Sequence, residues 1–344
     1  MPKIQPLEQT AKQKQGNSFN TLAQLPTDVR AKFQKLGGKK YHTYNIVSEL
    51  LKLNTPLKKG YIRTLGCTDI FEERNGNFKS KLCRNRACIH CNNIKTANLI
   101  NGYKKEIQPK IENGDVYLLT LTRKSVSSRN LRSTIQEMNK NFSNIIRVLN
   151  EKRNWGISGI RVIEVTNAPL TDSGYHPHIH ALIWGDNLPT NFENIIFLEW
   201  QKRYGSILAS KKGYDIKKAN SNSFKELFKY VTKMSVSKID KKTKTFYPEI
   251  INTTLVALHR LRTIQSFGKL KKEIIPKEPK IIVIEAKTIE TRRFMWNEKD
   301  WHCTDDVNLV LSGNKQETKY VPLKMPIPIG ELVKKYVVKL KNSG

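Results

Sequence analysis

The chain lacks any long run of apolar residues. No segment approaches the roughly 20 consecutive apolar residues that a helix needs to span a bilayer. The first residues contain no continuous apolar stretch of the kind that a secretory signal requires. We therefore expect a soluble cytoplasmic protein with no membrane partner, whose cysteines are reduced or bound to metal rather than paired in disulfides.

Acidic residues are also scarce. The 344 residues include 30 Asp and Glu against 61 Lys and Arg, a formal net charge of +31. A surplus of this size favours a polyanionic partner, because each phosphate that a protein neutralises releases counterions. The alternative is a generally basic protein from a proteome rich in lysine and asparagine, and both interpretations can hold together.

Cysteine is rare, but four of the five cysteines fall in one short segment. Cys67, Cys83, Cys88 and Cys91 have the spacing Cys-x15-Cys-x4-Cys-x2-Cys. Four thiolates can close a tetrahedral zinc site and so fold a segment that has few apolar side chains of its own. The Cys88-x2-Cys91 pair is the specific part of the pattern. We predict a structural zinc site here; ordinary buried cysteines are the alternative.

Basic residues accompany these cysteines. Arg84 and Arg86 lie between the second and third cysteines, and Lys95 follows the fourth. Cationic side chains of this kind hold the phosphates of nucleic acids. We therefore predict that this segment contacts a nucleic acid, and Arg84, Arg86 and Lys95 are the candidate DNA-binding residues if that nucleic acid is DNA.

Three of the seven histidines lie within five residues, at His176, His178 and His180. The apolar run 181–184 that follows favours a strand, in which alternate side chains share a face. His178 and His180 would then present two imidazoles about 7 Å apart to one divalent ion. The alternative is an incidental tract of surface histidines.

The region 113–237 has the pattern of one compact α+β domain. The expected elements are strands at 116–122, 158–166, 175–184 and 214–217 and helices at 131–149, 192–204 and 223–236. This β-α-β-β-α-β-α order is typical of a split-βαβ sheet of the ferredoxin or RRM type with one added helix.

Glu164 is the predicted third metal ligand. A hairpin centred on Thr171 would place Glu164 opposite His178, on the face of the histidines. One bulge in the loop would reverse this register. The alternative is an edge-strand carboxylate paired with a lysine.

The helix at 223–236 holds Glu226, Tyr230 and Lys233. Residues three or four apart on a helix lie on one face, so these side chains can converge on one site. A neighbouring metal ion or ammonium group favours the phenolate form of a tyrosine and makes it a nucleophile. The alternative is a tyrosine packed on the sheet beside a solvated glutamate.

The remaining chain divides around this domain. We expect a basic, partly disordered arm at 1–60, with a short helix near 22–36, and the zinc segment at 61–100. A basic extension covers 238–344, with a helix over 247–267.

Together these pieces resemble the rolling-circle plasmid replication initiators of the HUH endonuclease superfamily. The resemblance covers about residues 67–267 and depends on the cysteine segment, strand 119–122, strand 161–166, the His-Pro-His-Ile-His strand and the Glu226-x3-Tyr230 helix. The N-terminal 60 residues and those after about 270 match no family pattern.

The resemblance implies a mechanism. His178, His180 and Glu164 would hold Mg²⁺ or Mn²⁺ at the scissile phosphate of single-stranded or supercoiled origin DNA. Tyr230 would attack, leaving a 5′-phosphotyrosine link and a 3′-hydroxyl primer. Glu226 would act as the general base for the terminating cleavage. No Walker motif is present, so a host helicase must unwind the DNA and a host polymerase extend the primer.

Three other functions are compatible with these residues. A transposase or relaxase would use the same chemistry on other DNA. A non-catalytic, zinc-dependent DNA-binding regulator would have no need of Tyr230. A zinc or manganese hydrolase of small phosphorylated substrates fits the charge of +31 poorly.

Overall fold

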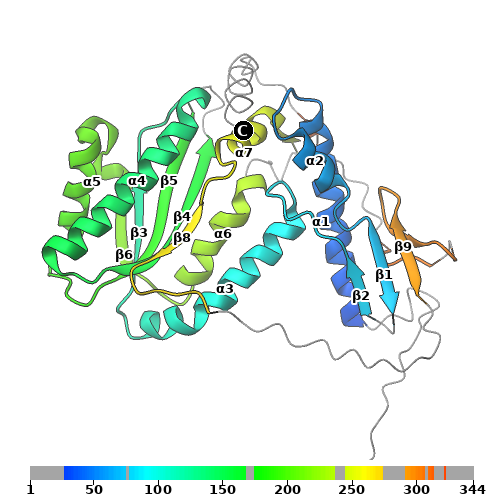
Figure 1. Cartoon of the computed structure of the whole chain (residues 1–344), viewed down its shortest axis with the longest axis horizontal. Coiled ribbons are helices and arrows are strands. Elements are labelled where there is room, and N and C mark those ends of the chain that lie inside the picture. Colours follow the sequence, from blue (N-terminus) through cyan, green and yellow to red (C-terminus); the bar gives the residue numbers. More distant parts are fainter. Residues whose placement is uncertain are drawn as a thin grey trace, which may run out of the picture. The chain divides into compact units, whose positions relative to one another are not determined.

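A computed structural model describes residues 27–74, 77–167, 174–236, 245–273, 291–306, 309–313 and 321–322. The chain forms two compact units, and each takes segments that are far apart in sequence (Figure 1). The smaller unit draws on Met1–Gly38, Thr68–Lys81 and Lys280–Gln316, and the larger unit contains the rest. This grouping differs from the four successive segments expected from sequence. Among the described residues no helix is both long and apolar enough to cross a membrane.

The larger unit is built on a five-stranded antiparallel sheet. Its strands are β3 (Tyr117–Thr122), β4 (Ser158–Asn167), β5 (Tyr175–Trp184), β6 (Tyr214–Lys218) and β8 (Ile264–Phe267), in the order β6-β3-β5-β4-β8. Helix α4 (Ser128–Arg153) leads from β3 to β4, and β5 lies between these two strands. Helix α5 (Phe192–Leu208) leads from β5 towards β6, with β3 between them. The mixed α+β class is therefore confirmed.

Both faces of this sheet are covered by helices, because the central strands β3, β4 and β5 carry buried apolar side chains on both faces. On one face Leu119 and Ile179 pack with α4 and α5. On the other face Ile160 and Leu182 pack with α3 (Ile89–Glu112) and α6 (Ser223–Val236) (Figure 1). The two-residue period of β5 places the histidines on the α3 and α6 face, in line with Leu182.

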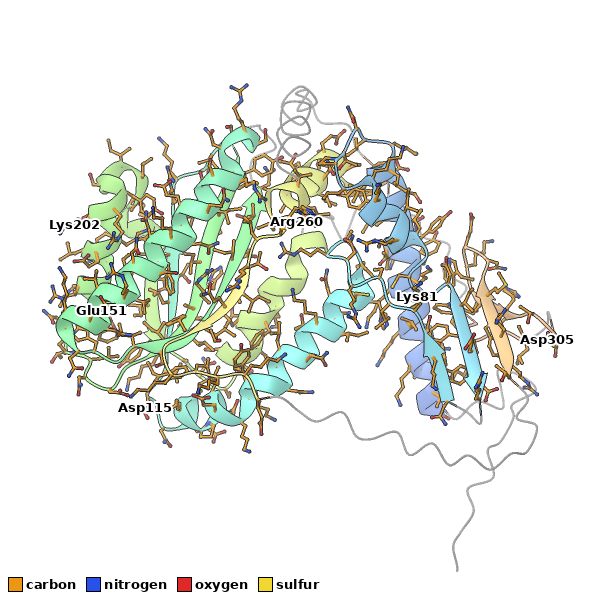
Figure 2. All side chains as sticks on the ribbon, viewed as in Figure 1. Lys81, Asp115, Glu151, Lys202, Arg260 and Asp305 are labelled. Carbon is orange, nitrogen blue, oxygen red and sulfur yellow. The ribbon has the colours of Figure 1, made fainter. Side chains whose placement is uncertain are left out.

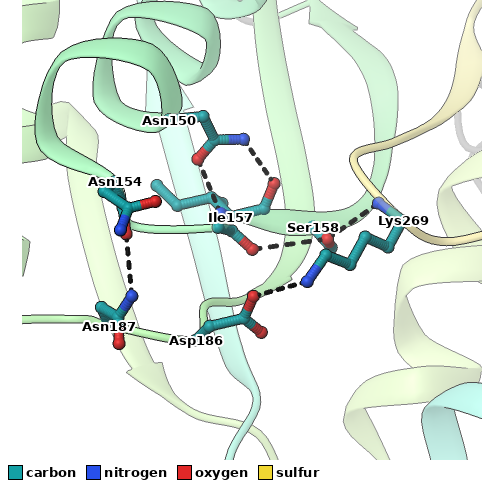
Figure 3. A network of polar contacts seen from close by, with 8 residues as sticks. Asn150, Asn154, Ile157, Ser158, Asp186, Asn187 and Lys269 are labelled. Atoms are coloured by element: carbon teal, nitrogen blue, oxygen red, sulfur yellow. Dashed lines mark hydrogen bonds and ion pairs between the residues drawn. The ribbon is translucent and has the colours of Figure 1, made fainter.

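A polar network fixes the end of the sheet where β4 begins (Figure 3). Asn150 near the end of α4 exchanges two hydrogen bonds with the backbone of Ile157, at 2.6 and 2.9 Å. The backbone N–H of Lys269 donates to Ser158 Oγ, and its ammonium group pairs with Asp186 at 2.8 Å. These bonds join α4, β4 and the segment after β8 at one edge.

The helix predicted over 247–267 is wrong in its second half. Helix α7 (Pro248–Ala257) ends at Leu258, and Arg260 adopts a left-handed backbone with φ of 57°. Strand β8 then pairs antiparallel with β4 along Gly159–Val162. The apolar residues whose spacing fits one helix are Leu255, Leu258, Leu261 and Ile264. Leu255 lies in α7, Leu258 and Leu261 lie in the turn that follows, and Ile264 begins the edge strand β8.

The arm predicted for residues 1–60 is helical from Thr27 onward. Helix α1 (Thr27–Leu51) is followed by α2 (Lys58–Leu65), and residues 1–26 lie outside the described part. Within the larger unit, Ile46, Val47 and Leu50 are buried against Tyr61 and Phe246. This second half of α1 is therefore anchored by a core that the arm prediction did not include.

The smaller unit contains a four-stranded antiparallel sheet. Its order is β10-β9-β1-β2, with β1 (Ile70–Arg74), β2 (Asn77–Ser80), β9 (Arg292–Trp296) and β10 (Trp301–Cys303). Phe33, Phe71, Phe294 and Trp301 form its largely aromatic core. Part of the predicted C-terminal extension is thus folded; residues 323–344 lie outside the described part. A short parallel pair, β7 (Thr245–Phe246) with β11 (Val321–Pro322), belongs to the larger unit.

Candidate functional site

The histidines and Glu164 lie on neighbouring strands of the central sheet. In the register of β4 with β5, Glu164 is directly opposite His178, as the hairpin centred on position 171 predicts. The loop residues 168–173 themselves lie outside the described part. The side chains of Glu164, His178 and His180 share one face of the sheet. His178 and His180 are two residues apart on β5, and residues directly opposite each other on paired strands point to the same side.

Glu164 and His180 are in direct contact. Glu164 Oε2 lies 3.0 Å from His180 Nε2, and both side chains are buried. The rings of His178 and His180 are nearly parallel, with centroids 5.9 Å apart. A carboxylate and two imidazoles that lie side by side on one face of a sheet are donor types suited to a divalent cation.

Three threonines, which the sequence interpretation did not assign, orient the two rings. Thr120 Oγ1 lies 3.1 Å from His180 Nδ1, and Thr122 Oγ1 lies 2.9 Å from His178 Nδ1. Thr166 Oγ1 is 3.2 Å from His178 Nε2. The spacing Thr120-x-Thr122 in a strand beside the histidines is the signal that could have identified the first two.

The environment keeps His178 neutral. Burial lowers the pKa of His178 to about 4, and the charges of His176 and His180 act in the same direction. His176 lies close by, with ring centroids 4.4 Å apart, and burial lowers its pKa as well. A neutral imidazole is the form that binds a metal ion, so His178 is in its ligand form at pH 7.

Helix α6, which holds Glu226, Tyr230 and Lys233, packs on the histidine face of the sheet. Leu227 and Phe228 are fully buried with residues of β4 and β5. Just before α6, the N–H of Ala219 donates to the carbonyl of Val116, which precedes the first residue of β3. His178 lies opposite Thr122, the last residue of β3. The helix therefore starts at the far end of the sheet from the histidines and runs along the sheet (Figure 1). Glu226 is partly exposed, and the side chains of Tyr230 and Lys233 lie outside the described part.

The four cysteines of the zinc prediction come together in the larger unit. All four Sγ atoms lie within 4.8 Å of one another, and three of the separations are 3.5, 3.6 and 3.7 Å. Zinc–sulfur bonds of about 2.3 Å place tetrahedral ligands about 3.8 Å apart, so the group fits the ion. A disulfide would require about 2 Å. The group can hold a metal ion such as zinc.

Backbone donors support this cysteine group. The N–H groups of Arg84 and Asn85 point to Cys91 Sγ and Cys83 Sγ, at 3.3 and 3.4 Å. Cys88 caps the start of α3 by accepting from Cys91 N–H. Hydrogen bonds from N–H groups to sulfur stabilise thiolates. Hydrogen bonds from the neighbouring cysteine thiols, of which that from Cys67 has the largest effect, lower the pKa of the Cys83 thiol.

The basic residues of this segment have different environments. Arg84 and Lys95 are exposed. Arg86 is largely buried, and its guanidinium group donates to the carbonyls of Leu258 and Leu261. Arg86 therefore joins the cysteine segment to the turn after α7.

Comparison with known proteins identifies the family. A family model described as "Replication protein" matches residues 75–320, more than half of the chain. A "Protein rep" of Streptococcus pneumoniae serotype 2 is 33% identical over 113 residues, 31% of this chain and 33% of that protein. A "Protein rep" of Lentilactobacillus hilgardii is 25% identical over 177 residues, 49% of this chain and 54% of that protein. The matches thus span about a third and about half of these relatives' lengths, and no solved structure matches. The chain belongs to the replication protein family.

Proposed function

We propose that this protein initiates rolling-circle replication of a plasmid by nicking one strand of its origin DNA through Tyr230. The observation that carries the proposal is the contact of Glu164 with His180, beside the ring of His178, on the sheet face where α6 packs. The strand order, with β5 between β3 and β4, supports the split-βαβ core of an HUH endonuclease. The charge of +31 and the family membership support DNA as the partner.

The proposed metal ligands are His178, His180 and Glu164, for Mg²⁺ or Mn²⁺. The donor set fits such an ion, since it combines a carboxylate with two imidazoles held by threonines. When bound, the cation would withdraw charge from the phosphoryl oxygens of the scissile phosphate. Imidazole ligands favour Mn²⁺ over Mg²⁺ in this set.

In the proposed reaction the phenolic oxygen of Tyr230 attacks phosphorus and the 3′-oxygen of the strand leaves. The products are a 5′-phosphotyrosine link and a free 3′-hydroxyl that primes a host polymerase. Lys233, one turn after Tyr230 in α6, would favour the phenolate. Glu226, one turn before it, would take a proton from water when the cycle closes. A host helicase would supply the unwinding.

A nicking assay tests this function. The protein is incubated with single-stranded origin DNA and Mn²⁺, and covalent adducts are separated under denaturing conditions. Wild type and Tyr247→Phe, a matched loss of one hydroxyl near α7, should form the adduct, whereas Tyr230→Phe should form none. Glu226→Ala should nick but fail to release the strand at termination.

The same assay distinguishes the alternatives. If the protein is a non-catalytic DNA-binding regulator, the Tyr230→Phe variant should keep the regulatory function of the wild type. A transposase or relaxase would form the same adduct, and its DNA partner would not be a replicon origin. An adduct of normal yield from Tyr230→Phe would contradict the proposed nucleophile.

A further inference from the structure

A basic pocket lies beside the cysteine group, within the larger unit. Its volume is about 330 Å³, and three segments enclose it: the start of α2, residues 83–86 and the end of α7 with the turn that follows. Its cationic lining residues are Lys59, Arg63, Arg84, Arg86 and Arg260, with His259 beside them, and no carboxylate from the described part of the chain lines it. The proposed chemistry at the histidine strand uses none of these residues.

Four of these cations have no counter-charge among the described residues. Lys59, Arg63, Arg84 and Arg260 are exposed, and none forms an ion pair in the described part of the chain. Like charges that converge on one hollow repel each other unless an anion joins them. The positive charges of Arg260, Arg132 and Arg86 add to burial in lowering the pKa of His259 at the same wall. The pocket is therefore a region of positive potential.

The walls of the pocket are fixed by bonds that leave these cations available. Arg86 holds the turn after α7 through the carbonyls of Leu258 and Leu261, so it is a positioning residue. The loop 83–86 is held by N–H groups that donate to cysteine sulfur. The side chain of Asn85 in this loop lies over Gly60, with its Nδ2 atom 2.7 Å from where a Cβ of residue 60 would be. Arg84 and Arg260 both have left-handed backbones, with φ of 55° and 57°.

The start of α2 adds backbone donors to the same hollow. Leu57, Lys59 and Gly60 line the pocket, and the first N–H groups of a helix have no partner inside the helix. Such groups, with the helix dipole, favour an anion. Arginines and free N–H groups together are the donors that hold phosphate oxygens.

We infer that this pocket binds backbone phosphate of a nucleic-acid strand, through Arg63, Arg84, Arg260 and Lys59. Its volume admits a phosphodiester with its sugar. The pocket would hold the strand by charge, because phosphate contacts position a strand without reading its sequence. The ligand class rests on the proposed function, whereas the existence of an anion site does not.

The test is a salt titration of binding to a fluorescent single-stranded oligonucleotide, followed by anisotropy. Arg63→Glu, Arg84→Glu and Arg260→Glu are compared with Lys202→Glu, an equal charge change at an exposed site on α5 (Figure 2). Affinity falls as salt rises, and loss of one phosphate contact should make the slope of log affinity against log salt less negative by about 0.7. Each pocket variant should show that loss and bind about tenfold more weakly at low salt, while Lys202→Glu keeps the wild-type slope.

Other results of this titration would overturn the inference. If the three pocket variants have the same slope as Lys202→Glu, the pocket does not contact the phosphates of the strand. Competition by inorganic phosphate as strong as that by the unlabelled strand would make the ligand a free phosphate. Thermal melting and zinc content of each variant establish that it is folded. Because binding is measured without nicking, failure of the pocket and failure of Tyr230 as nucleophile are separate results.

Discussion

At the residue scale, the proposed metal site at the histidines is surrounded by hydrogen-bonding side chains that hold the two rings. A threonine hydroxyl lies within hydrogen-bond distance of Nδ1 in both His178 and His180, and Glu164 lies at the same kind of distance from His180 Nε2. A ring fixed in this way loses little freedom when it binds a ligand. The threonines are therefore part of the site, although they are not predicted ligands.

We predict that Thr122→Val lowers the affinity for Mn²⁺ by about 10–100-fold, as expected when a partner of a ligating imidazole is lost. The change keeps the shape of the side chain and removes the hydroxyl at His178 Nδ1. Calorimetric titration with Mn²⁺ measures the effect. Thr134→Val, a buried change in α4, is the control and should bind as wild type does. Equal affinities of all three proteins would contradict the positioning role.

The low pKa of His178 predicts a loss of stability in acid. The folded pKa is about 4 and the ordinary value is 6.5, so between these pH values the unfolded chain binds a proton that the folded chain does not. The free energy of unfolding of the metal-free protein should therefore fall as the pH falls from 6.5 to 4, by up to about 1.4 kcal/mol per pH unit for this group. Urea unfolding at several pH values measures it. In His178→Gln this part of the dependence should disappear; an unchanged dependence would contradict the assignment.

At the element scale, α6 is fixed to the sheet by apolar contacts. Leu227 is fully buried among Ile160, Val162 and Leu182, whereas Leu198 on α5 is 58% exposed. We predict that Leu227→Ala lowers the free energy of unfolding by about 2–5 kcal/mol. Leu198→Ala should change it by less than about 0.5 kcal/mol. Denaturant unfolding of the two variants measures the difference, and similar losses would contradict the placement of α6.

The element order of the central domain was predictable, because its strands and helices have clear periods of two and about 3.6 residues. The register of Glu164 against His178 agrees with the hairpin centred on Thr171, and a slip of one residue would have placed Glu164 on the opposite face. Strand β8 was not predictable, because its four residues follow α7 with apolar spacing that also fits a helix. Pairing with the distant strand β4 decides its structure, and no local pattern contains that information.

At the scale of the whole molecule, segments far apart in sequence build each unit. The smaller unit joins residues near Phe33, Phe71 and Trp301, and the basic pocket joins α2, the cysteine loop and the end of α7. A sequence divided into successive domains cannot show such associations. The sequence did predict the cysteine group, since four cysteines in one short segment are typical of a structural zinc site.

The cysteine group predicts a dependence of the larger unit on metal. It links Cys67, the loop 83–86 and the first turn of α3. Removal of metal by a chelator, or the change Cys88→Ser, should lower the melting temperature by on the order of 10 °C, since each kcal/mol is worth about 2–4 °C in a unit of this size. Calorimetry with metal analysis measures both quantities. Cys303→Ser, outside the group, should keep the zinc content; equal zinc content in Cys88→Ser would contradict the site.

The most direct test of the whole account is to identify the residue that carries the DNA. Wild-type protein is allowed to react with origin DNA and Mn²⁺, digested with nuclease and trypsin, and analysed by mass spectrometry. The account predicts a nucleotide attached to the tryptic peptide Tyr230–Lys233, which begins at the proposed nucleophile. Attachment to a peptide holding another tyrosine, or no attached nucleotide in a protein that nicks, would contradict it.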